Sequence, residues 1–340
     1  MTTEMKPEEG YSKIIEIGFA FWKSQALMAA VGLGIFSALA KGPMRDDALR
    51  KTLGVHGRGF RDLLSALVSL EMLEETADGY ANTKISDYYL DGAKPTYIGG
   101  LLELASDRLY PLWGRLGQGL LTGEPQNEAK EEEDYYANLG EDRRRLAQFL
   151  KAMDGLSAQA ARVMAERYPW ARCQTFIDVG GARGAAAVEL ARRYPHLHGG
   201  CFELPAVRPH FEEYVAQAGL QKRLRFYEGD FFRDPLPPAQ TLLMGHVLHN
   251  WDPDQRRRLL RKAYDALPLG GGLIVYEWFL REKPAAEPLP QLMSLNMLLA
   301  TRGGGGSDWR KCREWMLEVG FREAHMEPLL GPCSMVIGTK

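Results

Sequence analysis

The sequence predicts an α/β protein in which a doubly wound, largely parallel sheet follows a smaller helical domain. Two observations support this fold class. From residue 176 onward, apolar strand-like runs alternate with helical spacing, and the first of these runs ends in a glycine-rich turn. The chain also has 340 residues, more than one compact core usually contains, which predicts a second domain.

The N-terminal region is expected to form helices followed by a small hairpin. Apolar residues recur at helical spacing in residues 19–39 and 58–73, and an Asp-Gly pair is a turn signal within residues 74–83. This order is typical of a winged helix, a shape that suggests DNA binding. The second helical run carries Asp62 and several leucines in place of a basic face, so phosphate contacts would be few.

Several more helices are expected before the sheet begins. An acidic stretch at residues 128–136 interrupts them and predicts an exposed loop. The expected divisions are therefore a winged-helix-like domain over residues 1–95, a helical bridge over residues 96–165 and the sheet domain over residues 166–340.

The most informative segment is residues 176–203, which reads as a strand, a glycine-rich turn, a helix and a second strand. Its β-branched and aromatic residues favour a buried strand that delivers Asp178 and several glycines to its carboxyl end. Glu203 closes the second strand, where an acid typically accepts hydrogen bonds from ribose hydroxyls. The segment predicts a nucleotide-type cofactor. A dinucleotide site, or glycines that only permit tight helix packing, also fits this pattern.

Composition and charge restrict the classes of partner. A formal net charge of −2 and a pI near 6.4 argue against nucleic acid or an anionic membrane, and the arginine clusters at 143–145 and 256–258 are expected to be solvated helix faces. Four cysteines without metal-ligand spacing predict reduced thiols and no metal site. Residues 1–10 are polar, and the uncharged run 26–40 is short for a bilayer, so a soluble, cytoplasmic protein without a signal peptide is expected.

Further motifs accompany the glycine-rich turn. In chain order they read DVGGARG, FELP, GDFF, LHNW and GGGLIVYE. Together they resemble the pattern of the S-adenosylmethionine-dependent small-molecule O-methyltransferases, which include plant caffeate and flavonoid enzymes, hydroxyindole O-methyltransferase and bacterial natural-product enzymes. The resemblance covers almost the whole chain. It implies a Rossmann-like class I methyltransferase sheet, S-adenosyl-L-methionine as the cofactor, and an N-terminal winged-helix-like domain that forms a domain-swapped homodimer.

The resemblance also implies which residues hold the cofactor. Ser157 matches a position that bonds the methionine carboxylate, Glu203 the ribose position, Asp230 the position at the adenine amino group and Phe231 the ring that packs on adenine. A helix-cap role is the alternative for Ser157. The remaining residues of the implied cofactor site belong to turns and strand ends, and they are Asp178, Gly180, Gly181, Leu204 and Gly245.

A general base is implied for an aromatic hydroxyl acceptor. His249 stands at the family's catalytic position, and an imidazole with an ordinary pKa near 6.5 can remove a phenolic proton as the methyl group moves. Glu277 matches the carboxylate that orients this histidine. The alternatives are a structural histidine and a strand-end acid bonded to a helix amine. His246, three residues earlier on a strand-like run, is expected to face the opposite side.

The implied acceptor wall combines aromatic and methionine side chains with one acid. Ordinary core packing is the alternative for Trp113, Phe149 and Met153. The complete set is Trp113, Phe149, Met153, Asp154, Trp251, Met293 and Met297.

Three positions depart from the family pattern. Ala182 replaces a third glycine, Asn250 replaces the acid that usually follows the histidine, and the loop at residues 300–309 lacks a second glutamate that Asp308 replaces only if the loop shifts. Four consecutive glycines in this loop predict a rearrangement when the acceptor binds.

We therefore expect O-methylation of a small aromatic hydroxyl compound in natural-product biosynthesis. The alternatives keep the fold and cofactor but methylate carbon or nitrogen, or catalyse cyclisation or hydroxylation. A non-enzymatic DNA-binding regulator is a third reading of the N-terminal region.

Overall fold

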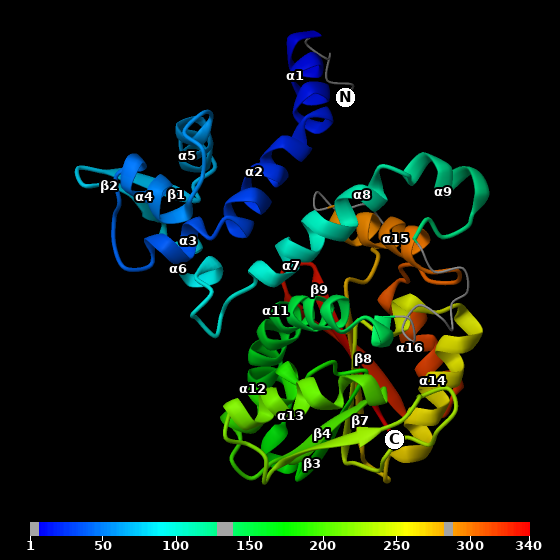
Figure 1. Cartoon of the computed structure of the whole chain (residues 1–340). Coiled ribbons are helices and arrows are strands. Elements are labelled where there is room, and N and C mark those ends of the chain that lie inside the picture. The colour runs from blue at the N-terminus through cyan, green and yellow to red at the C-terminus, as the bar shows by residue number, and fades with distance from the viewer. Residues whose placement is uncertain (1–6, 128–138, 282–287) are drawn as a thin grey trace. The chain divides into compact units, whose positions relative to one another are not determined.

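The computed structural model describes residues 7–127, 139–281 and 288–340. The chain forms two compact units, Met1–Leu109 and Tyr110–Lys340 (Figure 1). The helical bridge expected at residues 96–165 is thus not a unit of its own, because its first helix belongs to the first unit and its later helices to the second. The expected acidic loop at residues 128–136 lies outside the described residues.

The first unit consists of helices around a two-stranded hairpin, as the winged-helix-like expectation requires. In the hairpin, the Thr76 hydroxyl donates to the Gly79 carbonyl at 2.8 Å, and the glycine adopts a φ of 124°. The elements are α1 Pro7–Gly18, α2 Ala20–Gly32, α3 Ile35–Leu39, α4 Asp46–Leu53, α5 Phe60–Ser69, β1 Leu73–Thr76, β2 Gly79–Asn82, α6 Lys84–Leu90, α7 Gly99–Leu104 and a π-helix at Ala105–Leu109.

The first helices of this unit expose apolar side chains. Helix α1 buries none of its residues, and Ile14, Ile17 and Trp22 are all exposed. Among the described residues, the 26-residue run Pro7–Gly32 is the one stretch whose length and composition would allow a helix to cross a membrane, and 11% of its apolar window is buried. This stretch is longer than the uncharged run at residues 26–40, which is too short to cross a bilayer.

The second unit contains a seven-stranded sheet in the order β5-β4-β3-β6-β7-β9-β8. The first five strands in this order pair in parallel, whereas β9 pairs antiparallel with both β7 and β8. The strands are β3 Thr175–Val179, β4 His198–Glu203, β5 Leu224–Glu228, β6 Thr241–Gly245, β7 Gly272–Glu277, β8 Glu323–Leu330 and β9 Cys333–Thr339. The expected doubly wound sheet is confirmed, with one antiparallel strand.

Helices cover both faces of this sheet, so successive strand residues enter two different cores (Figure 1). Phe176 packs with α11 and α12, and Ile177 packs on the other face with α14 and α16. The helices are α8 Tyr110–Trp113, α9 Leu116–Thr122, α11 Arg143–Arg167, α12 Ala185–Arg193, α13 Arg208–Gln217, α14 Pro253–Ala266, α15 Leu289–Ala300 and α16 Trp309–Glu318. Short 3₁₀ turns occupy Trp170–Arg172, Pro205–Val207 and Leu248–Asn250. The four cysteines are free and buried.

Candidate active site

The site begins with the turn between β3 and α12, where the backbone lies against neighbouring side chains. Gly180 and Gly184 have φ values of 72° and 91°, and a Cβ on Gly180 would lie 2.8 Å from Val247 Cγ2. Only glycine adopts such a conformation without strain. Ala182, at the position where the O-methyltransferase motif has glycine, has a φ of 50°. This chain therefore places an L side chain in a left-handed backbone conformation.

Glu203 faces this turn from the end of β4. Its Oε1 accepts the backbone N–H of Leu204 at 2.8 Å, and its Oε2 accepts that of Ala182 at 3.3 Å. Burial raises the pKa of Glu203 to about 7, against the opposing effect of the two N–H donors. One carboxylate thus links the turn to the adjacent strand end and keeps acceptor capacity for a ligand.

Asp178 lies beneath the same turn. A Cβ on Gly181 would meet its Oδ2 at 2.6 Å, so the glycine permits the close approach of turn and acid. Burial and the nearby charge of Glu203 raise the pKa of Asp178 to about 8.

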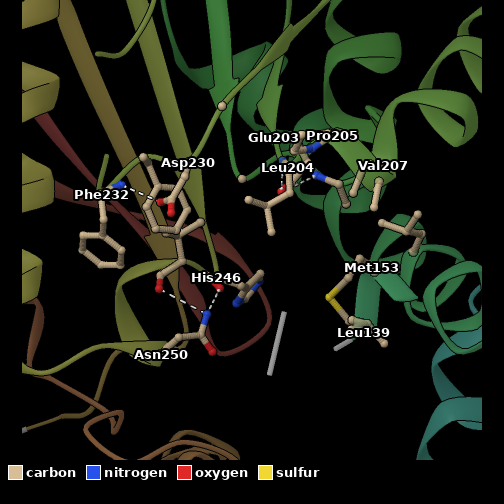
Figure 2. A pocket seen from close by; sticks show the side chains of 18 of the residues that line it. Leu139, Met153, Glu203, Leu204, Pro205, Val207, Asp230, Phe232, His246 and Asn250 are labelled. Carbon is tan, nitrogen blue, oxygen red and sulfur yellow. Dashed lines mark hydrogen bonds between the residues drawn. The ribbon is translucent and has the colours of Figure 1, made fainter. Parts of the chain in front are cut away.

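A cavity of about 790 Å³ opens in front of the turn (Figure 2). Its size is suited to a ligand such as a nucleoside with an amino-acid tail. Met153 lies on one side of the opening and Asp230 on the other. The expected site residues that line it are Phe149, Met153, Ser157, Gly180, Glu203, Leu204, Asp230, Phe231, Gly245 and Trp251. Asp178 and Gly181 are not among the lining residues, because Gly181 belongs to the turn and packs against Asp178.

The end of the cavity near Asp230 combines an acid with aromatic rings. Asp230 Oδ1 accepts the backbone N–H of Phe232 at 2.8 Å, and the Asp230 N–H donates to Asp234 Oδ2 at 2.8 Å. Phe231 packs edge-on against Trp251, with ring centroids 5.8 Å apart. A hydrogen-bond acceptor beside flat apolar surfaces suits a purine base with an amino group.

Helix α11 supplies the opposite wall. Phe149, Met153 and Ser157 recur every four residues and therefore share one helix face, which lines the cavity. Asp154 belongs to a different face and is not among the residues that line this cavity. It accepts a hydrogen bond from Arg183 Nε at 2.5 Å, while the arginine stacks 4.6 Å above the Tyr214 ring, so it ties α11 to the glycine-rich turn.

His249 lies in the 3₁₀ turn that follows β6, and its relation to Glu277 differs from the expectation. Glu277 Oε1 accepts the backbone N–H of His249 at 2.9 Å, so the carboxylate fixes the main chain and does not hold the imidazole. Burial raises the pKa of Glu277 to about 7. Burial, with His246 and Arg256 nearby, holds the pKa of His249 well below its ordinary value, which leaves the imidazole neutral at pH 7.

His246 corrects another expectation, because it does not point away from His249. Strand β6 ends at Gly245, and His246 has a φ of 55°, so the alternation of a strand no longer applies. The two imidazole rings lie 5.6 Å apart, and His246 lines the cavity (Figure 2). Asn250 Nδ2 donates to the carbonyls of His246 at 3.0 Å and Val247 at 3.2 Å, which closes the turn.

The other expected acceptor residues gather on α8 and α15 and do not line the cavity. Trp113 Nε1 donates to Asn296 Oδ1 at 3.0 Å, and α15 also carries Met293 and Met297. Helix α15 packs against both α8 and the turn Leu248–Asn250. Met293 and Met297 therefore lie on the helix that contacts the His249 segment, and Trp113 is hydrogen-bonded to that helix.

The loop with four glycines is held against the same turn. The Gly305 N–H donates to the His249 carbonyl at 2.8 Å, and a Cβ on Gly304 would lie 2.7 Å from that oxygen. Asp308 caps α16 by accepting the Arg310 N–H at 2.7 Å and is therefore engaged elsewhere. The glycines allow a close approach of two backbones, a reason that the sequence alone did not reveal.

Sequence reasoning missed Arg256, which it treated as part of a solvated arginine face. The side chain is 4% exposed, and it donates to the carbonyls of Trp251 at 2.7 Å and Gly305 at 2.6 Å. Its position in the first turn of α14, four residues before the buried Leu260, was the available signal.

Comparison with known proteins assigns this architecture. Residues 113–322 match the family model for an O-methyltransferase domain, and residues 15–92 match that for an O-methyltransferase dimerisation domain. The chain belongs to the O-methyltransferase family.

Relatives of this O-methyltransferase extend over nearly its full length. The tetracenomycin polyketide synthesis 8-O-methyl transferase TcmO of Streptomyces glaucescens is 37% identical over 332 residues, which are 97% of each chain. The N,N-dimethyltransferase OxyT of Streptomyces rimosus is 35% identical and covers 96% of this chain and 95% of its own. The crystal structure of human N-acetylserotonin methyltransferase in complex with S-adenosylmethionine has a TM-score of 0.90 at 27% identity, and covers 100% of this chain and 99% of its own.

Family membership confirms several expectations. The protein is a methyltransferase with a class I methyltransferase sheet, its cofactor is S-adenosylmethionine, and its N-terminal dimerisation domain supports a homodimer. The turn, the Glu203 carboxylate and the cavity before them fit this cofactor, since they offer acceptors for hydroxyls and an apolar surface for a base.

Proposed function

We propose that this O-methyltransferase methylates a hydroxyl oxygen of a small aromatic acceptor during natural-product biosynthesis, with His249 as the general base. The observation that carries the proposal is the place of the buried His249 imidazole, in a turn at the carboxyl end of β6 between His246 and Asn250, which line the cavity. Ligands of open α/β sheets bind at this sheet edge.

The cavity residues are assigned to the cofactor by their chemistry. Glu203 accepts hydrogen bonds from the ribose hydroxyls, Asp230 accepts one from the adenine amino group and Phe231 packs on the adenine. Ser157 binds the methionine carboxylate from the face of α11. When bound, S-adenosylmethionine supplies a methyl group on a sulfonium, which leaves as a neutral thioether.

The residues of the protein act on the acceptor proton. A phenol with a pKa near 10 is mostly protonated at neutral pH, and a neutral imidazole can take its proton as methyl transfer proceeds. Glu277 acts through the His249 main chain and contributes a carboxylate that favours positive charge on the nearby ring.

An aromatic acceptor is supported by the side chains beside the His249 turn. Trp113, Met293 and Met297 lie on α8 and α15, and an aromatic ring with two flexible thioethers suits a flat apolar ligand. TcmO is described as a polyketide O-methyltransferase, which agrees with such an acceptor.

Nitrogen methylation is the second candidate. OxyT is described as an N,N-dimethyltransferase, and it is nearly as similar to this chain as TcmO. The same neutral imidazole would accept a proton from an amine.

The exposed apolar helices of the first unit are assigned to the dimer interface. The dimerisation match begins at residue 15, within α1, and includes Ile17, Phe21 and Trp22. Burial of these side chains by a second copy of the chain, and not by a membrane or nucleic acid, accounts for an apolar surface this large.

Mass spectrometry tests the assigned reaction. The protein is incubated with S-adenosylmethionine and a panel of phenols, naphthoates, aromatic keto acids and arylamines, and S-adenosylhomocysteine and methylated products are quantified. Acceptor-dependent gain of one methyl group on oxygen is expected. If the products carry the methyl group only on nitrogen or carbon, the enzyme is an N- or C-methyltransferase and the proposed O-methylation is wrong.

A further inference from the structure

We propose that Arg256 is a positioning residue for methyl transfer, because it locks the glycine loop against the main chain of His249. The inference rests on the proposed function of His249 as the base.

Arg256 is a buried cation with two backbone partners on separate segments. Its Nε donates to the Trp251 carbonyl at 2.7 Å and its Nη2 to the Gly305 carbonyl at 2.6 Å. Its guanidinium lies 5.8 Å from the Trp315 ring centroid, and the side chain is 4% exposed. A planar guanidinium that bridges two carbonyls fixes their separation and orientation in a way that an ammonium group cannot.

The main chain of His249 is held from both sides. Glu277 Oε1 accepts its N–H at 2.9 Å, and the Gly305 N–H donates to its carbonyl at 2.8 Å. Because Arg256 binds the carbonyl of the same glycine, the arginine holds in place the residue whose N–H restrains His249.

The glycines make this contact possible. A Cβ on Gly304 would overlap the Thr301 hydroxyl and would lie 2.7 Å from the His249 carbonyl oxygen and 2.9 Å from the Asn250 oxygen. A Cβ on Gly305 would meet only Ser294 Oγ, at 3.7 Å, which is an ordinary contact. The two neighbouring glycines thus differ in whether they tolerate a methyl group.

Arg256 also sets the charge around the turn. The ionisable groups that interact with it or with its neighbours Glu277 and His249 are Asp252, Cys312, Cys333 and His246. Loss of the guanidinium removes a positive charge that favours ionised Glu277 and neutral His249, so the pKa of both groups should rise. The acid limb of the kcat/KM profile should therefore move to higher pH.

The test compares Arg256→Gln with Arg257→Gln. Arg257 lies on the same helix but is partly exposed and pairs with Asp254 and Glu318, so its loss removes an equal charge without touching the glycine loop. Arg256→Gln is expected to lower kcat by about 10- to 100-fold. S-adenosylhomocysteine affinity should stay within about twofold and the acid limb should move upward, whereas Arg257→Gln should change none of these quantities. Full kcat in Arg256→Gln, or a parallel loss of cofactor affinity, overturns the proposal.

A second pair of variants covers the case in which Arg256→Gln does not fold. Gly304→Ala should reproduce the loss of kcat and Gly305→Ala should not, because only the former methyl group displaces the His249 carbonyl. Equal kcat in the two alanine variants overturns the proposal.

Amide hydrogen exchange separates this inference from the proposed function. In wild-type protein with bound S-adenosylhomocysteine, the backbone amides of His249 and Gly305 should be protected from exchange. In Arg256→Gln, or in Gly304→Ala if Arg256→Gln does not fold, these two amides should lose protection before amides elsewhere do. This result requires no acceptor, so it stands if the acceptor panel shows nitrogen methylation or no product. Unchanged protection of both amides in the variant would overturn the proposal that Arg256 holds the glycine loop against His249.

Discussion

The backbone N–H of His249 donates to Oε1 of Glu277 at 2.9 Å, and both residues are buried at the carboxyl end of adjacent strands. The carboxylate therefore positions the histidine through its main chain, so the contributions of its charge and of its hydrogen bond can be separated by substitution.

Glu277→Gln keeps a hydrogen-bond acceptor but removes the charge. We expect kcat to fall about tenfold, because the neutral amide no longer favours positive charge on the imidazole. Steady-state kinetics with saturating cofactor measure this effect. Unchanged kcat would confine Glu277 to a structural role.

The same variant should be more stable than wild type at high pH. Burial raises the pKa of Glu277 from 4.5 to about 7, so the stabilisation that its protonated form provides is fully present below pH 4.5 and is lost as pH rises through 7. Glu277→Gln should accordingly melt at a higher temperature than wild type at pH 8 and at a similar temperature at pH 5. A lower melting temperature at pH 8 contradicts this reasoning.

His249→Ala tests the base directly. Turnover should fall by about 10²–10⁴-fold, while the dissociation constant of S-adenosylhomocysteine, measured by calorimetry, stays nearly unchanged. His325→Ala, which removes an exposed imidazole on β8, is the matched control and should retain wild-type turnover. Wild-type activity of His249→Ala would show that His249 is not the general base.

Asn250→Asp would restore the acid of the family pattern, yet it should impair the enzyme. Asn250 Nδ2 donates to two backbone carbonyls, and an ionised aspartate would set an acceptor against them. The loss should cost about 1–3 kcal/mol of stability and lower turnover. Thermal denaturation and kinetics are compared for Asn250→Asp and Asn250→Ala. The alanine variant shows the effect of losing the two hydrogen bonds, and any further loss in the aspartate variant is due to repulsion between the carboxylate and the two carbonyls. Higher turnover in the aspartate variant would mean that the acid has a chemical role.

The sheet and cofactor turn were predictable because their signals are local. Residues such as Phe176, Ile177 and Val179 are buried on both faces of the sheet, and glycines mark the point where the strand ends. The face of α11 that carries Met153 and Ser157 likewise follows from helical spacing.

The environment of His249 was not predictable in the same way. His246 adopts a left-handed backbone conformation that its sequence does not indicate, which turns its ring toward His249. Arg256 is buried in contact with Gly305, which lies 49 residues later in the chain, and with the still more distant Trp315. Local patterns cannot specify contacts that depend on such distant segments.

Cofactor affinity should depend on the ionisation of Glu203. Its pKa of about 7 in the ligand-free protein means that below this pH the carboxyl group must lose a proton before it accepts both ribose hydroxyls. The dissociation constant of S-adenosylhomocysteine should rise about tenfold from pH 8 to pH 6, with proton release in calorimetry. Glu203→Gln should bind weakly at both pH values. A pH-independent constant in wild type would contradict ionisation-linked binding.

Ala182 offers a test of backbone strain in the cofactor turn. With a φ of 50°, its Cβ adds about 1 kcal/mol of unfavourable energy that glycine would not, and glycine in turn loses more conformational entropy on folding. Ala182→Gly should therefore preserve or slightly raise the melting temperature without weakening S-adenosylhomocysteine binding. Ala182→Val should lower both stability and affinity, because a β-branched side chain disfavours the left-handed region still more strongly. Equal melting temperatures of the glycine and valine variants would mean that the turn relaxes to a negative φ in solution.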